Sequence, residues 1–203
     1  QIITILDGSA FRRYLNNMKN MAMELLMNTD MVIFNRCTPE DEALVLYQRT
    51  VRSVNTNCDL VFEDTKGEEI EAPEPDLPYS LDTDPIEITD ENYATFYIDL
   101  SEHPDRYKNK RISFLVQIMK DKRMPQNMFV GGRRAMTCCE NDIRFLPYVF
   151  ISPEAGRYVN RSWAQVTAEM HWEFHEAYEE EGPVFYAKDI KACTRPIQEV
   201  ITF

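Results

Sequence analysis

The chain of 203 residues, with 44% hydrophobic and 28% charged residues, has the composition of a globular protein rather than of a disordered one. No run approaches the ~18 consecutive apolar residues of a membrane-spanning helix, and no signal-peptide pattern opens the chain. The net charge of −12 disfavours nucleic acids as partners, because phosphates are bound by clustered Lys and Arg. Five cysteines without a disulfide spacing favour a reducing compartment, so we expect a cytoplasmic protein that is not bound to a membrane.

Residues 1–63 carry the pattern of a parallel α/β layer. Three apolar, β-branched runs are typical of buried strands, namely residues 1–6, 31–34 and 58–62. Helices are expected between them, the first after Ser9 and the second from Thr38, and this alternation with short connections predicts parallel strands. In the first helix Met18 and Leu25 fall at core spacing, so we expect both side chains to be buried.

Three strands and two helices make an incomplete sheet, because open parallel sheets usually have more strands and are covered on both faces. We interpret residues 1–63 as the C-terminal half of such a domain. The chain opens at Gln1 directly in a strand, so we expect it to be a piece of a longer protein. One edge or face of this sheet should be unusually exposed, and self-association through it is a further expectation.

An acidic, proline-bearing segment at residues 64–84 is predicted to be an extended linker. Residues 85–203 then predict a short helix at 90–102 and several short strands, separated by turn signals such as Gly131-Gly132. The expected strands are residues 111–119, 127–130, 134–137, 148–151, 163–174 and 184–190. Short strands in this number favour a small OB-like β-barrel, so the predicted fold class is α/β plus mostly-β.

The expected strand at 29–36, TDMVIFNR, is followed by a helix and then by VRSVNTNC at 51–58. In this order residues 1–63 resemble the later half of the CobW/HypB/UreG-type P-loop GTPases, in which such a strand carries the base-recognition motif NKxD. The residues that the resemblance places at the nucleotide are Asn35, Arg36 and Thr38. The resemblance also implies that the intact protein binds GTP and Mg²⁺ through a missing N-terminal half. Its implied role is metal delivery or insertion, with a metal or a client metalloprotein as partner.

Departures from that family predict an inactive fragment. Arg36 replaces the motif's Lys, and Thr38 stands where the guanine-reading Asp would be. The phosphate-binding pattern G-x-x-x-x-G-K-[ST] and the metal-binding acids are absent from the sequence. Without groups that hold the phosphates and the metal ion, phosphoryl transfer is not catalysed, so we expect no GTPase activity. By residue type alone, Asn35 is also typical of a turn residue at the end of a strand.

Adjacent Cys138 and Cys139 lie within the pattern R-x-x-x-x-CC-x-x-D, for which Arg133 or Arg134 supplies the arginine and Asp142 the final acid. With this pattern, residues 86–203 resemble the C-terminal domain of a permease-subunit family, which implies a module but no reaction. Neighbouring side chains of a strand point to opposite faces. The two thiols therefore fit separate metal ligands, redox groups or small core residues.

Four polar residues alternate with apolar ones near the end of the strand expected at 163–174, and they are Glu169, His171, Glu173 and His175. The alternation places them on one face, while Val166, Met170 and Phe174 belong to the opposite face, which we expect to be core. Imidazole and thiolate together favour Zn²⁺ over Mg²⁺. The candidate Zn²⁺ ligands are Cys138, Cys139, His171 and His175, with Glu169, Glu173 and Asp142 as helpers. The alternative is a solvated polar face.

The basic stretch at 108–134, with Tyr107, Phe114 and Phe129, is similar to an OB groove for single-stranded nucleic acid, but it spans solvent-facing strand positions and is more typical of a solvated face. Two functions stay open. The chain is either the C-terminal portion of a CobW-like GTP-binding protein or a non-enzymatic module whose barrel binds a metal or a protein. A cysteine-based redox protein is a third interpretation.

Overall fold

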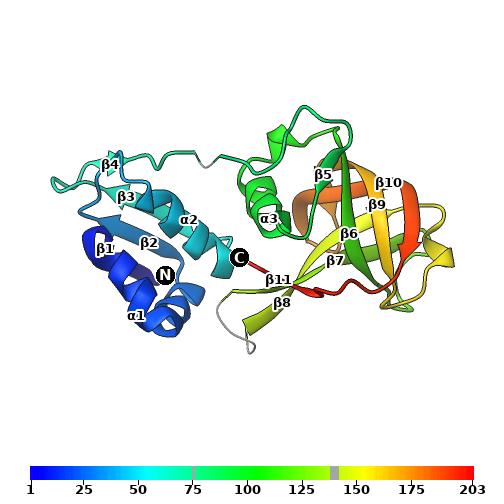
Figure 1. The fold of residues 1–203 in the computed structure, drawn as a ribbon, viewed down its shortest axis with the longest axis horizontal. Helices are drawn as coiled ribbons and strands as arrows, with labels where there is room; N and C mark the ends of the chain where they lie inside the picture. The colour runs from blue at the N-terminus through cyan, green and yellow to red at the C-terminus, as the bar shows by residue number, and fades with distance from the viewer. Residues whose placement is uncertain (75, 138–141) are drawn as a thin grey trace. The chain divides into compact units, whose positions relative to one another are not determined.

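The computed structural model describes residues 1–74, 76–137 and 142–203. The chain forms two compact units, Gln1–Asp76 and Leu77–Phe203 (Figure 1). The architecture is mixed α/β, with a four-stranded sheet in the first unit and a seven-stranded sheet in the second. None of the helices among the described residues has the length and apolar character needed to cross a bilayer.

The first unit is a sheet in the strand order β1-β2-β3-β4 with two helices. Its elements are β1 (Ile3–Asp7), α1 (Gly8–Met27), β2 (Met31–Asn35), α2 (Ala43–Val54), β3 (Asp59–Glu63) and β4 (Glu69–Ile70). β1, β2 and β3 are parallel, and β4 returns antiparallel to β3. The parallel pairing predicted for the first three strands is thus confirmed.

The second helix begins later than the sequence pattern predicts. Residues 38–41 form a turn, in which the Asp41 N–H donates to the Thr38 carbonyl at 3.0 Å. The Asp41 carboxylate accepts from the Ala43 N–H at 2.9 Å, which satisfies one of the free donors at the start of α2. Asp41 therefore provides the hydrogen bond that we expected from Thr38.

α1 is kinked at Met18, whose backbone (φ −139°, ψ 43°) is not helical. Met18 and Leu25, both expected in the core, are 41% and 47% exposed. The core is filled instead by Phe11, Met23 and Leu26, none more than 3% exposed. The prediction assumed one unbroken period of 3.6 residues, and a break in the helix shifts the phase of its second half.

Both helices cover the same face of this sheet. The Phe34 ring of β2 stacks on Tyr47 of α2 at 5.2 Å and meets Phe11 of α1 edge-on at 4.9 Å. Successive right-handed crossovers in one direction place their helices on one side of a sheet. On the other face Ile3 and Ile5 are 50% and 64% exposed, so the prediction of an unusually exposed face is confirmed.

The second unit is built around a closed circuit of five strands (Figure 1). Its elements are β5 (Ile86–Ile88), α3 (Tyr93–Glu102), a 3₁₀ turn (Pro104–Arg106), β6 (Arg111–Met119), β7 (Met128–Met136), β8 (Ile143–Ile151), a 3₁₀ turn (Ala155–Arg157), β9 (Trp163–His175), β10 (Glu180–Cys193) and β11 (Val200–Thr202). The pairs β6–β7, β7–β8, β10–β9 and β9–β6 are antiparallel, and β8–β10 is parallel. β5 and β11 add short parallel pairs to β6 and β7.

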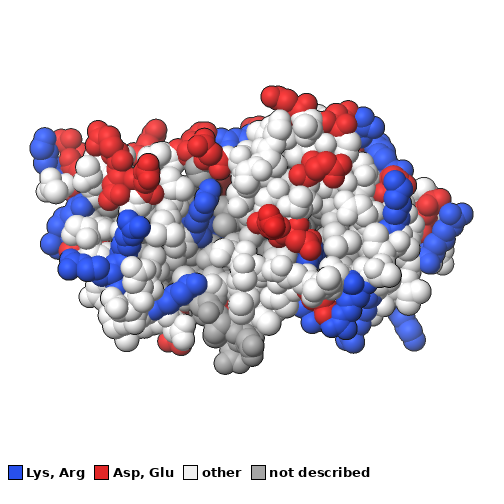
Figure 2. Space-filling model, viewed as in Figure 1, with Lys and Arg blue, Asp and Glu red and all other residues white. Residues whose placement is uncertain are grey.

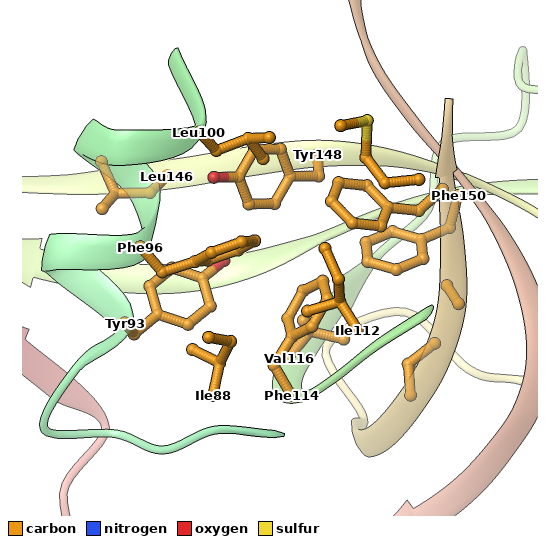
Figure 3. Close-up of a cluster of buried hydrophobic side chains, with 14 of the residues drawn as sticks. Ile88, Tyr93, Phe96, Leu100, Ile112, Phe114, Val116, Leu146, Tyr148 and Phe150 are labelled. Atoms are coloured by element: carbon orange, nitrogen blue, oxygen red, sulfur yellow. The ribbon is translucent and has the colours of Figure 1, made fainter. Parts of the chain in front are cut away.

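Aromatic rings from α3 and the strands fill the core of this unit (Figure 3). The Phe96 ring of α3 lies 5.7 Å from Phe114 and 6.0 Å from Tyr148. Tyr107, Phe114 and Phe129 are fully buried. Because enclosed rings present no face to a nucleobase, these three residues do not form the base-stacking groove that their spacing suggested.

Gly131 and Gly132 lie inside β7 rather than in a turn. A Cβ on Gly131 would lie 2.8 Å from the Phe150 ring, and a Cβ on Gly132 would lie 2.0 Å from the Leu146 carbonyl oxygen. The glycines therefore permit a close approach by β8, which no larger residue allows. The two strands predicted on either side of them are one strand.

Residues 64–84, expected to be a linker, are divided between the units. The first part forms β4 on the edge of the first sheet. Further along, Tyr79 packs against the core of the second unit, and its hydroxyl oxygen lies 2.7 Å from that of Tyr107. Asp84 forms an ion pair with Arg111 of β6. Both ends of this segment are therefore attached to a unit and do not form a free linker.

Candidate functional site

The carboxyl ends of β1 and β2 bring together Asp7, Arg36 and the start of α1, where the sequence places a nucleotide. The Asp7 carboxylate accepts from the Ser9 N–H at 3.0 Å and lies 3.3 Å from the Arg36 guanidinium. The hydrogen bond from the Ser9 hydroxyl lowers the pKa of Asp7, so this carboxylate is charged at neutral pH. A phosphate at this helix N-terminus would have to compete with that carboxylate for the Ser9 N–H and the Arg36 guanidinium.

Cys37 closes the same edge from the other side. A Cβ on Gly8 would lie 2.5 Å from Cys37 Sγ, so the thiol packs directly over the start of α1. Burial raises the pKa of the Cys37 thiol to about 11, which keeps it protonated and unreactive. Asn35 Oδ1 is buried without a hydrogen-bond partner, and Thr38 is exposed. The expected nucleotide residues therefore surround a carboxylate and a thiol rather than an open cradle.

The polar face of β9 is divided among separate partners. Glu169 Oε1 lies 2.8 Å from His171 Nε2, and Glu169 Oε2 lies 3.2 Å from the Lys188 ammonium. Glu173 accepts from the Tyr186 hydroxyl at 2.6 Å. In the described part of the chain, no three His, Cys, Asp or Glu side chains converge as a metal site requires.

Cys138 and Cys139 lie outside the described residues. Asp142, their expected helper, pairs with the Arg144 guanidinium at 3.4 Å. The Zn²⁺ site that joins the two cysteines to the histidines of β9 therefore stays a prediction.

A groove of about 1170 Å³ lies between two loops of the second unit. One loop, residues 120–127, joins β6 to β7, and the other, residues 176–179, joins β9 to β10. The lining residues are Asp121, Arg123, Met124, Pro125, Met128, Phe174, His175, Glu176, Ala177 and Glu179. The groove thus combines apolar side chains with three carboxylates, one guanidinium and one imidazole.

Phe174 reaches this groove because β9 outruns its neighbour β6. β6 pairs with β9 only as far as Glu169. The inward positions Val166 and Met170 are fully buried, Trp172 is half-buried, and Phe174 is 64% exposed. The prediction that Phe174 belongs to the core is wrong, because the strict alternation along β9 continues past Glu169, where its pairing with β6 ends. The length of this alternating run is the sequence signal from which the overhang of β9 could have been predicted.

Hydrogen bonds hold both loops. The Tyr178 hydroxyl accepts from the Val149 N–H at 2.9 Å and donates to the Pro183 carbonyl at 2.9 Å. In the first loop the Asp121 carboxylate accepts from the Arg123 N–H at 2.9 Å and from its guanidinium at 3.1 Å. These bonds fix the conformation of each loop separately.

Of the predicted site residues that the structure describes, His175 lines the groove. Its Nδ1 accepts from the Ala177 N–H at 3.1 Å, so in the neutral ring the proton sits on Nε2. The imidazole therefore offers a hydrogen-bond donor to a ligand.

The charge that the groove presents to a ligand is negative. Hydrogen bonds from Arg123 lower the pKa of Asp121, and the pair neutralises itself. Within the described residues, Glu176 and Glu179 are exposed and form no ion pair. A positively charged ligand is therefore favoured here.

We expect the second unit to lose stability as the pH rises above about 10. Burial raises the pKa of Tyr178 from 10.0 to about 12. The folded state thus keeps this phenol proton at a pH where the unfolded chain loses it. The resulting stability is fully present below pH 10 and is lost as the pH approaches 12. The pKa values of several other buried tyrosines move in the same direction, namely Tyr79, Tyr93, Tyr107 and Tyr148.

Urea unfolding at about pH 8 and about pH 11, with phenolate absorbance followed in parallel, checks this expectation. Tyr178→Phe should flatten part of the alkaline loss, whereas Tyr14→Phe, at a 49% exposed position of α1, should leave it unchanged. A parent protein with the same unfolding midpoint at both pH values would contradict the expectation.

The family model of the DUF1980 C-terminal domain matches residues 65–201, which is more than half of the chain. The match begins before β4 and ends within β11, so it includes β5 to β10 and α3 in full and the first two residues of β11. The resemblance of residues 86–203 to a permease-subunit domain points to the same region. No curated protein matches the chain.

The identification of residues 1–63 with CobW/HypB/UreG-type GTPases is wrong. The family that matches is a domain of unknown function without evidence of GTP binding. GTP and Mg²⁺, which only that resemblance implied for the intact protein, are not tested by this finding. An apolar strand that ends in Asn and precedes a helix is common to parallel α/β layers and does not specify a nucleotide site. The chain belongs to the family of the DUF1980 C-terminal domain.

Proposed function

We propose that the second unit is an OB-type barrel that acts as a non-enzymatic binding module. Its strands close in the order β6-β7-β8-β10-β9-β6, with β8 and β10 parallel, which supports this assignment. OB folds bind their ligands along the second and third strands, between the loops that join strands one to two and four to five. Those loops correspond to residues 120–127 and 176–179, which border the groove.

The side chains of the groove support a protein segment with an apolar anchor and basic flanks. The observation that carries the proposal is the 64% exposure of Phe174 beside Glu176 and Glu179. Met124 and Met128 are flexible and polarisable, so they adapt to an inserted apolar side chain. The acidic groove opposes phosphates, which disfavours a nucleic-acid ligand.

Phe174→Ala is expected to weaken binding of a basic, apolar peptide by about 10-fold or more, because a large aromatic contact residue is lost. The probe is a fluorescein-labelled peptide with a Leu-Trp-Leu centre and Lys flanks, measured by fluorescence anisotropy on the full chain. The matched control is Val159→Ala, which removes apolar surface at a 72% exposed position outside the groove lining and should bind as the parent does.

Two comparisons test the chemistry of the ligand. The same peptide with Glu flanks, and an oligo-dT strand, should bind more weakly than the Lys-flanked peptide. Absence of binding by the Lys-flanked peptide, equal binding of the Glu-flanked one, or an unchanged affinity in Phe174→Ala contradicts the proposal.

A further inference from the structure

The face of the first sheet opposite α1 and α2 carries a continuous apolar surface, which we name the open face. Ile3 and Ile5 are 50% and 64% exposed, and Met31, Ile33 and Val61 are half-buried. The strand register places Ile5, Ile33 and Val61 in one row across three strands and Ile3 beside Met31 in the next row. Partners in register share a face, so these five side chains form a single patch.

Such a face is normally covered, because parallel sheets bury both faces. The alternate positions Val32, Phe34 and Phe62 are at most 5% exposed on the face that α1 and α2 cover. Within the described part of Gln1–Asp76, no element lies over the open face. A contiguous exposed apolar patch of this kind marks an interaction surface.

Carboxylates border the open face along β3 and β4. Asp59 and Glu63 point to this face, and the register pairs Glu63 with Glu69 of β4. Figure 2 shows acidic side chains gathered along the part of this unit where Figure 1 places β3 and β4. At the end of β1, by contrast, Asp7 is neutralised by Arg36. The border is therefore negative on the side of β3 and β4.

We propose that the open face docks one amphipathic α-helix of a partner protein, with Lys or Arg on the flank that faces β3 and β4. Three strands span about 14 Å, which matches the ~10–12 Å diameter of one helix. Strands of five residues run for about 16 Å, which a helix covers in about 11 residues. The apolar stripe of that helix lies over Ile5 and Ile33, and its cations lie near Glu63 and Glu69.

A second copy of this chain fits the open face less well. Two open faces packed together would offer each other the same aliphatic side chains and the same carboxylates, because a two-fold interface pairs a surface with itself. Such an interface supplies no cation to Asp59, Glu63 or Glu69. A basic amphipathic helix supplies both the apolar stripe and the cations.

Ile5→Lys is expected to weaken binding of a basic amphipathic helix to the full chain by about 10-fold or more, because a charge replaces the centre of the patch and repels the helix. The probe is a labelled helical peptide of about 18 residues, with Leu at i, i+3, i+4 and i+7 and Lys on one flank, followed by anisotropy. Leu25→Lys, at a 47% exposed position of α1 outside the open face, is the matched control and should bind as the parent does.

Glu69→Lys separates the charge contribution from the apolar one. It should weaken the Lys-flanked helix and strengthen the same helix with Glu in place of Lys. Ile5 and Glu69 are both exposed, so the variants should fold, and circular-dichroism melts establish that they do. Phe174→Ala should leave helix binding unchanged, so that this proposal and the one for the groove fail separately.

Equal affinity of the parent, Ile5→Lys and Glu69→Lys for the Lys-flanked helix overturns the proposal. Sedimentation velocity provides the second test. A parent that self-associates and an Ile5→Lys variant that does not would identify a second copy as the occupant, which also overturns it.

Discussion

Replacement of Gly132 by alanine is expected to cost about 3 kcal/mol of unfolding free energy or more, which is a large part of the ~5–15 kcal/mol that holds an ordinary domain. A Cβ at this position would lie 2.0 Å from the Leu146 carbonyl oxygen and 2.9 Å from its carbon. The obstacle is backbone, and pairing on both sides of it keeps β7 and β8 in register. The new methyl group therefore has to separate the two strands.

Urea unfolding of the full chain measures this loss. Gly156→Ala is the matched control, because a Cβ there would find its nearest neighbour, the Gln126 carbonyl oxygen, at an ordinary 3.8 Å. The control should unfold at the midpoint of the parent. A Gly132→Ala variant that unfolds at the same urea concentration as the control would contradict the close approach of β8 to β7 at this residue.

Arg133→Met is expected to cost about 3 kcal/mol, since the hydrogen bonds that its guanidinium donates to a carboxylate and a carbonyl are lost together. Arg133 is fully buried. Its guanidinium pairs with Asp90, donates to the Gln198 carbonyl at 2.7 Å and lies 5.2 Å from the centre of the Trp163 ring. Methionine fills a similar volume but donates to neither oxygen.

Arg134→Met is the control for this substitution, because Arg134 is the exposed neighbour on the same strand and should tolerate the change. Asp90→Asn combined with Arg133→Met should be less destabilised than the sum of the two single variants, because the unpaired carboxylate is removed. Purely additive losses in urea unfolding would argue that the pair contributes nothing specific.

Sequence reasoning succeeds here where the signal is local. The run at 111–119 coincides with β6 as the structure has it, Arg111–Met119, because apolar, β-branched residues between polar breaks define a strand on their own. It fails where a distant strand decides the conformation. The Gly131-Gly132 pair has the sequence pattern of a turn. The residues that require glycine there, Phe150 and Leu146, belong to the next strand, so the local sequence does not reveal them.

The candidate site was less accessible to prediction than the fold. The pairing of the strands in the second sheet brings together loops that β7, β8 and β9 separate along the chain, and no local pattern encodes that proximity. His175 was singled out as a metal ligand, and Phe174 was assigned to the core. The structure places both in the groove. Alternation indicates which face a side chain takes but not where neighbouring elements stop covering that face.

The buried guanidinium of Arg133 also has a consequence for synthesis of the chain on the ribosome. Its partner carbonyl at Gln198 lies 65 positions further along. At the usual elongation rate of 5–20 residues per second, this interval lasts roughly 3–13 s. During that time β8, β9 and β10 are themselves still being made, so a cation that can pair with Asp90 lacks its second acceptor, and β7 waits first for β8 and last for β11. Chaperones that bind incompletely closed sheets therefore have seconds to engage this domain before its final segment arrives.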